Sequence, residues 1–266
     1  MTVTRPTDQD DPLRDPDDLP PPETKAREPI VNIPAVVLVL GAIFALIHLV
    51  RVQFLIPDQD LVLFLWFSFI PGRYLAETAG LFPGGIAADA WTFATYAFLH
   101  GDVTHLLVNL FWMAAFGSAL ARRFGTTRFL IFSAACAAAG AGLHLWIYWG
   151  EMVPVIGASA AISGHMAGVA RFGFAPGGPL MRGLRASGDR TWHVPALSVL
   201  QTFSNRNALI FLGIWFAINF LFALGAGPLL GEGTRIAWEA HAGGFIAGLL
   251  LFRFLDPTPV MPRYIS

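Results

Sequence analysis

Residues 236–255 read IAWEAHAGGFIAGLLLFRFL, a stretch in which apolar and small residues dominate. An α-helix rises about 1.5 Å per residue, so about 20 mostly apolar residues are enough to cross the hydrocarbon core of a bilayer. The stretch therefore predicts a membrane-spanning helix. One histidine, His241, interrupts it, and polar side chains inside a bilayer are costly and often mark a functional site.

Five further apolar segments accompany this one in a chain of 266 residues. Hydrophobic residues make up 55% of the sequence and charged residues 13%, whereas a soluble domain carries about 25% charged residues. We therefore predict an all-α membrane protein in which residues 30–256 form a bundle of six transmembrane helices. The predicted spans before Ile236–Leu255 are Ile33–Val50, Thr104–Ala121, Phe129–Tyr148, Ile156–Phe172 and Ala208–Leu224.

The two ends of the chain differ from this bundle in composition. Residues 1–29 contain eight acidic residues, four basic residues and seven prolines. Such a segment cannot bury enough apolar surface to order itself, so we predict a disordered cytoplasmic tail. Residues 257–266 are expected to form a short cytoplasmic tail. Residues 61–69 are apolar but too few to span a bilayer, so we place them in the outer connector after the first span.

The arginines predict an orientation, because cytoplasmic loops carry an excess of positive charge. With the N-terminus inside, ten arginines fall in the inner loops and the C-terminal tail, and three fall on the outer side. The presence of one lysine against sixteen arginines, with a short tail, favours a bacterial plasma membrane. The inner set is Arg122, Arg123, Arg128, Arg171, Arg182, Arg185, Arg190, Arg206, Arg253 and Arg263, and the outer set is Arg51, Arg73 and Arg235.

A small set of polar residues lies inside the predicted spans. His105 is near the start of the second span, Ser159 is about three residues into the fourth, and His241 is about five residues into the sixth. All three spans enter from the outer side, so these side chains share roughly the outer third of the membrane. This common depth predicts a site assembled between helices. Asn109 follows His105 by four residues and shares its helix face.

Small residues recur at helical spacing on two of these spans. Ala240, Gly244 and Gly248 form one ladder, which shares the face of His241. Such ladders let helices pack closely in lipid. We therefore expect the sixth span to pack against the fourth and to bring His241 within hydrogen-bond reach of Ser159. The ladder of the fourth span consists of Gly157, Ala161, Gly164 and Gly168.

These residue types together suit nucleophilic catalysis. A serine hydroxyl is a weak nucleophile until a base accepts its proton, and an imidazole titrates near neutral pH. We therefore predict Ser159 as the nucleophile and His241 as the base. His105, Asn109 and the backbone N–H of Ser159 are candidate donors to the oxyanion of an acyl intermediate. Glu239 lies two residues before His241 and points to another face, so we expect a dyad.

Three stretches carry these residues: HGDVTHLLVN at 100–109, GASA at 157–160 and AHAGGFIAG at 240–248. They resemble, in the same order, the His-x4-His-x3-Asn, Gly-x-Ser-x and Ala-His-x2-Gly-x3-Gly motifs of the rhomboid family of intramembrane serine proteases. The resemblance covers residues 91–252. It implies the catalytic and oxyanion roles given above, and cleavage of membrane-anchored proteins near the outer membrane boundary without metal or cofactor.

Each feature also has a plainer interpretation. Serine in a membrane helix often bonds the carbonyl one turn back, and histidine and asparagine often join helices through hydrogen bonds. A catalytically inactive rhomboid-like protein that binds transmembrane partners is the main alternative, although such relatives usually lack the serine or the histidine. A transporter is disfavoured, because the spans show neither a path of charged residues nor inverted repeats with broken helices. The expected partners are transmembrane protein substrates and the lipid bilayer, with no nucleic acid and no metal.

Three further histidines receive structural roles. His100 is expected to be structural or interfacial. His144 is expected to belong to an aromatic belt at the outer boundary. His165 follows Ser159 by six residues, faces away from the site and is expected to pack in the interior.

Overall fold

The computed structural model describes residues 33–78, 80–182, 189–223 and 237–258, and the fold is given for these residues alone. The predicted tail 1–29 and the residues from 259 onward lie outside them. So do the last residue of the predicted fifth span, Leu224, and the first of the sixth, Ile236. The predictions made for these positions stay predictions.

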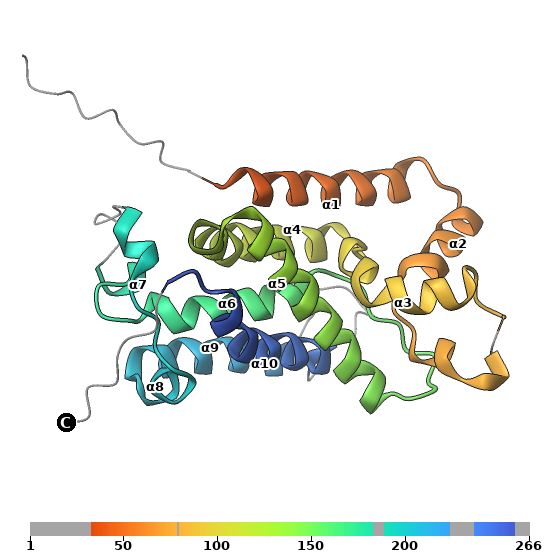
Figure 1. The fold of residues 1–266 in the computed structure, drawn as a ribbon. Helices are drawn as coiled ribbons and strands as arrows, with labels where there is room; N and C mark the ends of the chain where they lie inside the picture. Colours follow the sequence, from red (N-terminus) through yellow and green to blue (C-terminus); the bar gives the residue numbers. More distant parts are fainter. Residues whose placement is uncertain (1–32, 79, 183–188, 224–236, 259–266) are drawn as a thin grey trace, which may run out of the picture. The chain divides into compact units, whose positions relative to one another are not determined.

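The described chain is mainly helical, which confirms the all-α class (Figure 1). Within it, one isolated antiparallel bridge pairs Phe69 with Val155. The longer helices are α1 (Ala35–Gln53), α2 (Pro57–Phe67), α3 (Gly85–Thr95), α4 (Val103–Trp112), α5 (Ser118–Ile147), α6 (Ser159–Gly173), α9 (Arg206–Ala223) and α10 (Trp238–Leu255). The short segments are η2 (Pro71–Tyr74), η3 (Ala76–Thr78), η4 (Tyr96–Phe98), η5 (Met113–Gly117), α7 (Pro179–Arg182), η6 (Asp189–His193) and α8 (Val199–Ser204).

Two continuous helices of the described chain are long and apolar enough to cross a membrane, namely Ala35–Gln53 and Val103–Ile147. The second holds the predicted second and third spans, and its helical backbone is interrupted at Gly125, with φ 73° and ψ 170°. This left-handed φ is one that glycine adopts readily. Helices α6, α9 and α10 also lie on predicted spans, but α6 has only 15 residues. Helices at these positions are therefore confirmed, whereas six crossings stay a prediction.

Helices α5, α6 and α10 pack against one another, and every residue of α6 from 160 to 173 is buried. Its packing depends on small residues. A Cβ added to Gly164 would collide with Cys136 of α5, and one added to Gly244 of α10 would collide with the carbonyl oxygen of Ala160. On α5, a Cβ on Gly140 would lie 2.6 Å from the Cβ of Ala160. The three helices therefore approach backbone to backbone, as small-residue ladders allow.

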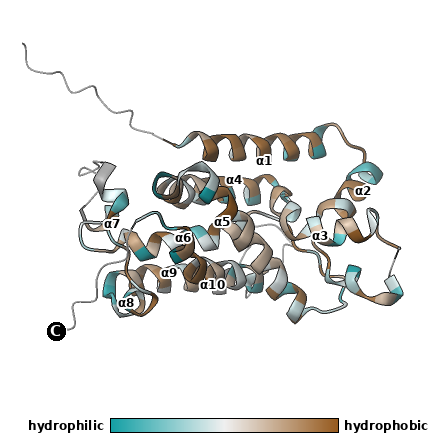
Figure 2. Cartoon of the chain, viewed as in Figure 1, coloured by the Kyte–Doolittle hydropathy of each residue, from teal (hydrophilic) through white to brown (hydrophobic). Residues whose placement is uncertain are grey.

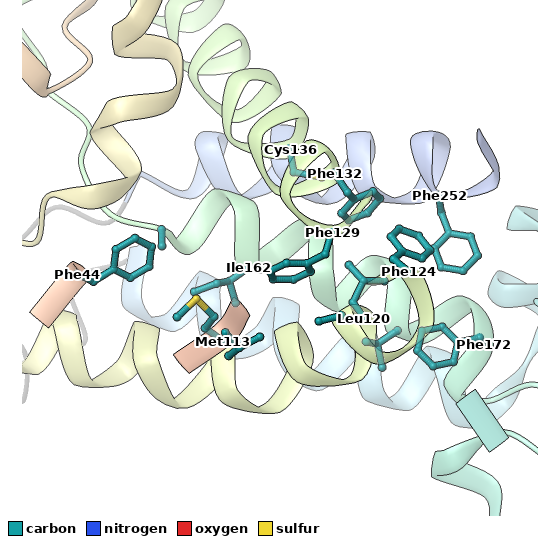
Figure 3. Close-up of a cluster of buried hydrophobic side chains, with 14 of the residues drawn as sticks. Phe44, Met113, Leu120, Phe124, Phe129, Phe132, Cys136, Ile162, Phe172 and Phe252 are labelled. Atoms are coloured by element: carbon teal, nitrogen blue, oxygen red, sulfur yellow. The ribbon is translucent and has the colours of Figure 1, made fainter. Parts of the chain in front are cut away.

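Aromatic side chains pack between α5, α6 and α10 (Figure 3). Phe124 contacts Phe132 edge to face, with ring centroids 5.4 Å apart, and contacts Phe252 at 5.2 Å. Phe172 stacks near Phe252 at 6.2 Å. Offset and edge-to-face pairs of this kind add to the stabilisation from buried apolar area. They join the first half of α5 to the C-terminal ends of α6 and α10.

The outward surface of the helices is also apolar. Figure 2 shows hydrophobic residues along most of α1, and Leu38, Leu46 and Val52 of this helix are 56%, 60% and 57% exposed. Apolar patches of this extent are rare on soluble monomers and mark surfaces that meet a partner or a membrane. The exposed face of α1 thus agrees with a membrane protein.

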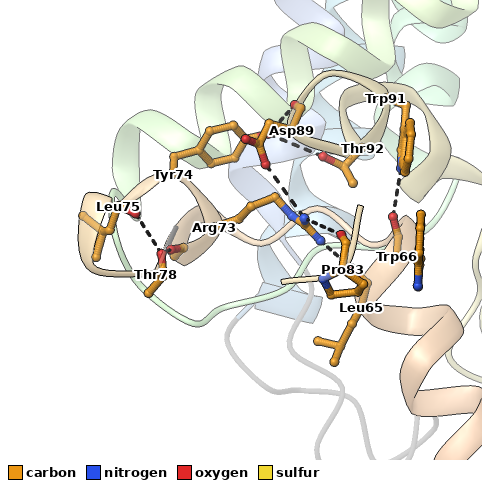
Figure 4. A network of polar contacts seen from close by, with 11 residues as sticks. Leu65, Trp66, Arg73, Tyr74, Leu75, Thr78, Pro83, Asp89, Trp91 and Thr92 are labelled. Atoms are coloured by element: carbon orange, nitrogen blue, oxygen red, sulfur yellow. Dashed lines mark hydrogen bonds and ion pairs between the residues drawn. The ribbon is translucent and has the colours of Figure 1, made fainter. Parts of the chain in front are cut away.

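The connector between α1 and α4, which is predicted to lie on the outer side, has a polar core of its own (Figure 4). The Arg73 guanidinium donates to the carbonyl oxygens of Pro83 and Leu65, and one of its nitrogens lies 3.8 Å from a carboxylate oxygen of Asp89. The Trp66 and Trp91 rings stack with centroids 5.7 Å apart. Residues 61–69 mostly belong to α2, and these contacts join α2 to α3.

A buried ion pair closes the end of the bundle at which α5 begins and α10 ends. This end is predicted to face the cytoplasm and is called the inner end, and the opposite end is called the outer end. Two nitrogens of Arg123 on α5 donate to the two carboxylate oxygens of Asp256, each at 2.8 Å. The Arg123 side chain is 0% exposed and also donates to the carbonyl oxygens of Trp192 and Val194. Its guanidinium lies 4.7 Å from the centre of the Phe172 ring. With these four hydrogen bonds, Arg123 fixes the C-terminal end of α10 to α5.

Candidate active site

Ser159 is the first residue of α6 and follows a turn at Gly157. Gly157 has a φ of 107°, a region that residues with a side chain rarely adopt. Its backbone N–H donates to the Tyr96 carbonyl oxygen at 3.0 Å. The turn presents the half-buried Ser159 side chain at the N-terminal end of a buried helix. At this end, backbone N–H groups lack intrahelical acceptors.

His241 of α10 meets this serine across the helix interface. Its Nε2 atom lies 2.7 Å from the Oγ atom of Ser159, a distance typical of a strong hydrogen bond. The contact depends on Gly244, one turn further along α10, because any Cβ there would strike the Ala160 carbonyl group. The structure thus brings together two residues that lie 82 positions apart in the chain.

His105 and Asn109 lie on α4, and the His105 ring approaches the serine turn. A Cβ on Gly157 would lie 2.6 Å from Nε2 of His105, so the imidazole packs directly against this backbone. The Asp102 side chain caps α4 by accepting from the His105 backbone N–H at 2.8 Å. Asn109 is 3% exposed, and its Nδ2 atom donates to the His105 carbonyl oxygen at 2.9 Å.

Ser163 differs from Ser159 in its hydrogen bond. Its hydroxyl donates to the Ser159 carbonyl oxygen at 2.7 Å, which is the bond one turn back that serine commonly makes in membrane helices. The Ser159 hydroxyl is directed to an imidazole. The Trp215 ring of α9 also lies near His241, with ring centroids 6.5 Å apart, and it stacks on Phe245. Trp215 was not identified from the sequence, because an apolar span gives no signal for one tryptophan.

His165 and His100 lie in the interior. His165 is 2% exposed, and its Nε2 atom lies 2.7 Å from the Ser133 hydroxyl, in agreement with the predicted packing role. His100 precedes α4 and is 1% exposed. Burial, assisted by the neighbouring His105, lowers the pKa of His100 to about 3, so its ring is neutral. Its carbonyl oxygen accepts from Arg51, which joins the end of α1 to the entry of α4.

The prediction for His144 is wrong, because this side chain is 0% exposed and is not part of a surface belt. Its Nδ1 atom lies 2.8 Å from a carboxylate oxygen of Glu239, and its Nε2 atom lies 2.9 Å from the Val153 carbonyl oxygen. The sequence held one signal for this pair. A carboxylate within a membrane helix needs a partner, and His144 is placed at a similar outer depth.

The described residues contain no group of three or more His, Cys, Asp or Glu side chains suited to hold a metal ion. The chemistry that this arrangement offers is that of a serine hydroxyl beside an imidazole. Nearby lie a second imidazole and a carboxamide that are able to donate hydrogen bonds. Such groups are the parts of a hydrolytic site that works through a covalent intermediate.

Comparison with protein families finds a match over part of the chain. The Rhomboid domain model matches residues 87–178, and this match supports membership of the rhomboid family. The matched range contains His105, Asn109 and Ser159, whereas His241 lies beyond it. No curated protein matches the chain. Together with the apolar helices, this match supports a membrane protein, and the rhomboid family includes intramembrane serine proteases.

Proposed function

We propose that this protein is an intramembrane serine endopeptidase that hydrolyses peptide bonds of membrane-anchored proteins near the outer membrane boundary. The observation that carries the proposal is the distance of 2.7 Å between Ser159 Oγ and His241 Nε2. This pair lies at the start of a buried helix in a chain that matches the Rhomboid domain model. The substrates are transmembrane proteins, which reach the site through the bilayer.

In the first half of the reaction, His241 accepts the hydroxyl proton of Ser159 at Nε2 while Oγ attacks the scissile carbonyl carbon. The carbonyl π bond opens and its oxygen becomes an oxyanion. The carbon–nitrogen bond then breaks, and the imidazolium gives its proton to the leaving amine. An acyl-enzyme ester on Ser159 and a free amino terminus are the products of this half.

In the second half, water attacks the ester carbon and His241 accepts a proton from that water. The ester bond breaks, Ser159 recovers its proton from the imidazolium, and the new carboxyl terminus leaves. The oxyanion forms in both halves, so the same donors act twice. The Ser159 backbone N–H, the His105 ring and Asn109 are the proposed donors. The Asn109 amide has two hydrogens and donates one to the His105 carbonyl oxygen, so the other is available to the substrate.

The proposed topology has six membrane crossings, with the N-terminus and C-terminus in the cytoplasm of a bacterial cell. It rests on the arginine distribution and on helices at the predicted segments. In this orientation α6 begins at Ser159 on the outer side of the membrane, so cleavage is proposed near the outer boundary. Labelling of single cysteines placed in the loops, in a Cys136→Ala background, tests the topology from both sides of the membrane.

Cleavage of a model transmembrane substrate in liposomes tests the proposal. We expect the wild-type protein to produce two fragments and the folded Ser159→Ala protein to produce none. Retained cleavage by pure Ser159→Ala would remove the serine mechanism. Absence of cleavage and of serine labelling in folded wild-type protein would favour the inactive rhomboid-like protein that binds transmembrane partners.

A further inference from the structure

One buried histidine outside the dyad, His144, contacts both the helix that carries His241 and the segment that leads to Ser159. His144 lies at the outer end of α5 and is 0% exposed. Its Nδ1 atom lies 2.8 Å from Glu239 Oε1 on α10, and its Nε2 atom lies 2.9 Å from the Val153 carbonyl oxygen. Glu239 comes two residues before His241, and Val153 comes six residues before Ser159. The proposed mechanism gives no role to His144 or Glu239.

The partners of the His144 ring determine where its protons lie. A carbonyl oxygen only accepts hydrogen bonds, so Nε2 carries a hydrogen and donates it to Val153. The remaining contact holds one proton between Nδ1 and the Glu239 carboxyl group. Either an imidazolium faces a carboxylate or a neutral imidazole accepts from a carboxylic acid. In both cases the ring bonds α10 on one edge and the segment before Ser159 on the other.

The segment from Val153 to Gly157 is held by backbone bonds on its other side. The Phe69 and Val155 backbones exchange hydrogen bonds of 3.2 and 2.9 Å, and the Gly157 N–H donates to Tyr96. These bonds attach the segment to the outer connector and to η4. They do not reach α10, which carries the base. His144 supplies a side-chain link between the strand that leads to the nucleophile and the first turn of the helix that carries the base.

We propose that His144 and Glu239 are positioning residues that set the distance between Ser159 Oγ and His241 Nε2. Neither residue is placed at the reacting atoms, and the inference rests on the proposed function of the dyad. Proton transfer depends on the heavy-atom distance, and a misplacement of about 1 Å costs about 10²-fold in rate. Without the link, the packing of Gly244 on Ala160 still holds the helices together. The first turn of α10 and the segment before Ser159 then lose the side-chain bond that fixes their relative position, so the dyad atoms can shift.

Two variants separate positioning from stability. His144→Phe keeps an aromatic ring next to Phe69 and Tyr148 but removes both hydrogen bonds, and it leaves Glu239 buried without its partner. The double variant His144→Phe/Glu239→Leu removes the pair together, which relieves the buried charge and restores stability. We expect His144→Phe to lower both Tm and kcat, and the double variant to recover Tm while kcat stays about 10- to 100-fold below wild type.

Glu239→Gln provides rescue by a conservative change. The glutamine amide donates to Nδ1 of a neutral imidazole, so the bond from Nε2 to Val153 persists without any charge on the pair. We expect this variant to keep kcat within about threefold of wild type, whereas Glu239→Ala loses as much as His144→Phe. Glu151→Gln is the matched control, because it makes the same chemical change at an exposed position of the same outer region.

The measurement is kcat and KM for a model transmembrane substrate in liposomes, with Tm of each purified protein. We expect the loss to fall on kcat and KM to change less than about twofold, because substrate contacts are intact. Wild-type kcat in the folded double variant would overturn the positioning role, and so would a loss in Glu239→Gln equal to that in Glu239→Ala. An inactive wild-type protein would instead refute the proposed function.

Discussion

Each end of α10 is joined to α5 by a buried pair of one basic and one acidic residue. The two pairs have different surroundings. At the inner end, Arg123 binds Asp256, with side-chain exposures of 0% and 5%. At the outer end, His144 binds Glu239, with exposures of 0% and 3%. Arg123 also donates to two carbonyl oxygens of the loop near η6 and packs on aromatic rings. In the outer pair, Glu239 comes two residues before His241, and His144 also contacts the carbonyl oxygen of Val153, six residues before Ser159.

This difference indicates that the inner end contributes to stability, whereas the outer end holds the residues of the proposed catalytic dyad. Arg123 of the inner pair packs on Phe172 and Phe252, and neither residue of the proposed dyad lies at this end of the described chain. The outer end contains the half-buried Ser159 and His241 and the turn at Gly157. We therefore expect changes at the inner end to alter stability with little effect on rate. Changes at the outer end should alter the rate.

The largest effect is expected from Gly244→Val, which lies between the two ends. The new side chain would collide with the Ala160 carbonyl group, and α10 would have to move away from α6. Because backbone cannot yield as a flexible side chain does, we expect a loss of more than about 3 kcal/mol of stability, with loss of activity. Thermal unfolding in detergent and the yield of folded protein measure it.

Gly142→Ala on α5 is the matched control for that substitution, since a Cβ at Gly142 meets no atom within 4 Å. Alanine favours a helix over glycine by about 1 kcal/mol, so this variant should be as stable as wild type or slightly more stable. A Gly244→Val protein with wild-type Tm and activity would contradict the close packing of α6 and α10.

Arg123→Met is expected to have the next largest effect, and on stability alone. Removal of the guanidinium leaves the Asp256 carboxylate buried without its partner, which costs about 3–5 kcal/mol. We expect the folded fraction to keep kcat within about twofold of wild type. The double variant Arg123→Met/Asp256→Leu should regain most of the lost Tm. A large fall in kcat for that stable double variant would remove the distinction between the two ends.

Asn109→Ala is expected to have a smaller effect, confined to the rate. Loss of one oxyanion donor typically lowers kcat by about 10²-fold, which corresponds to ~2.7 kcal/mol of transition-state stabilisation. The measurement is kcat for a model substrate in liposomes, with Tm as the control for folding. Lower Tm with unchanged kcat in the folded fraction would show that Asn109 joins helices and does not assist catalysis.

Much of the fold could be predicted from the sequence, because apolar stretches of helical length are a strong signal. The approach of Ser159 and His241 could be anticipated from their shared depth and from the small-residue face at Gly244. The bond between His144 and Glu239 could not, because hydropathy places residues along the membrane normal but not around it. His144 therefore looked like part of the aromatic belt next to it. Only the packing of α5 against α10 directs it inward.

The helix crossings illustrate the same limit. The fourth predicted span became a helix of 15 residues, because Gly157 turns the chain and the helix begins only at Ser159. The second and third spans form one helical run that changes direction at Gly125. A local backbone conformation determines where each helix begins and ends, and the pattern of apolar residues does not report it.

Labelling with a fluorophosphonate probe would show whether His241 activates Ser159. The probe forms a covalent bond with an activated serine, so purified wild-type protein, Ser159→Ala and His241→Ala should be compared in detergent. We predict labelling of the wild-type protein and none of either variant, with similar Tm for all three. Labelling of Ser159→Ala, or equal labelling of His241→Ala and wild type, would contradict the account.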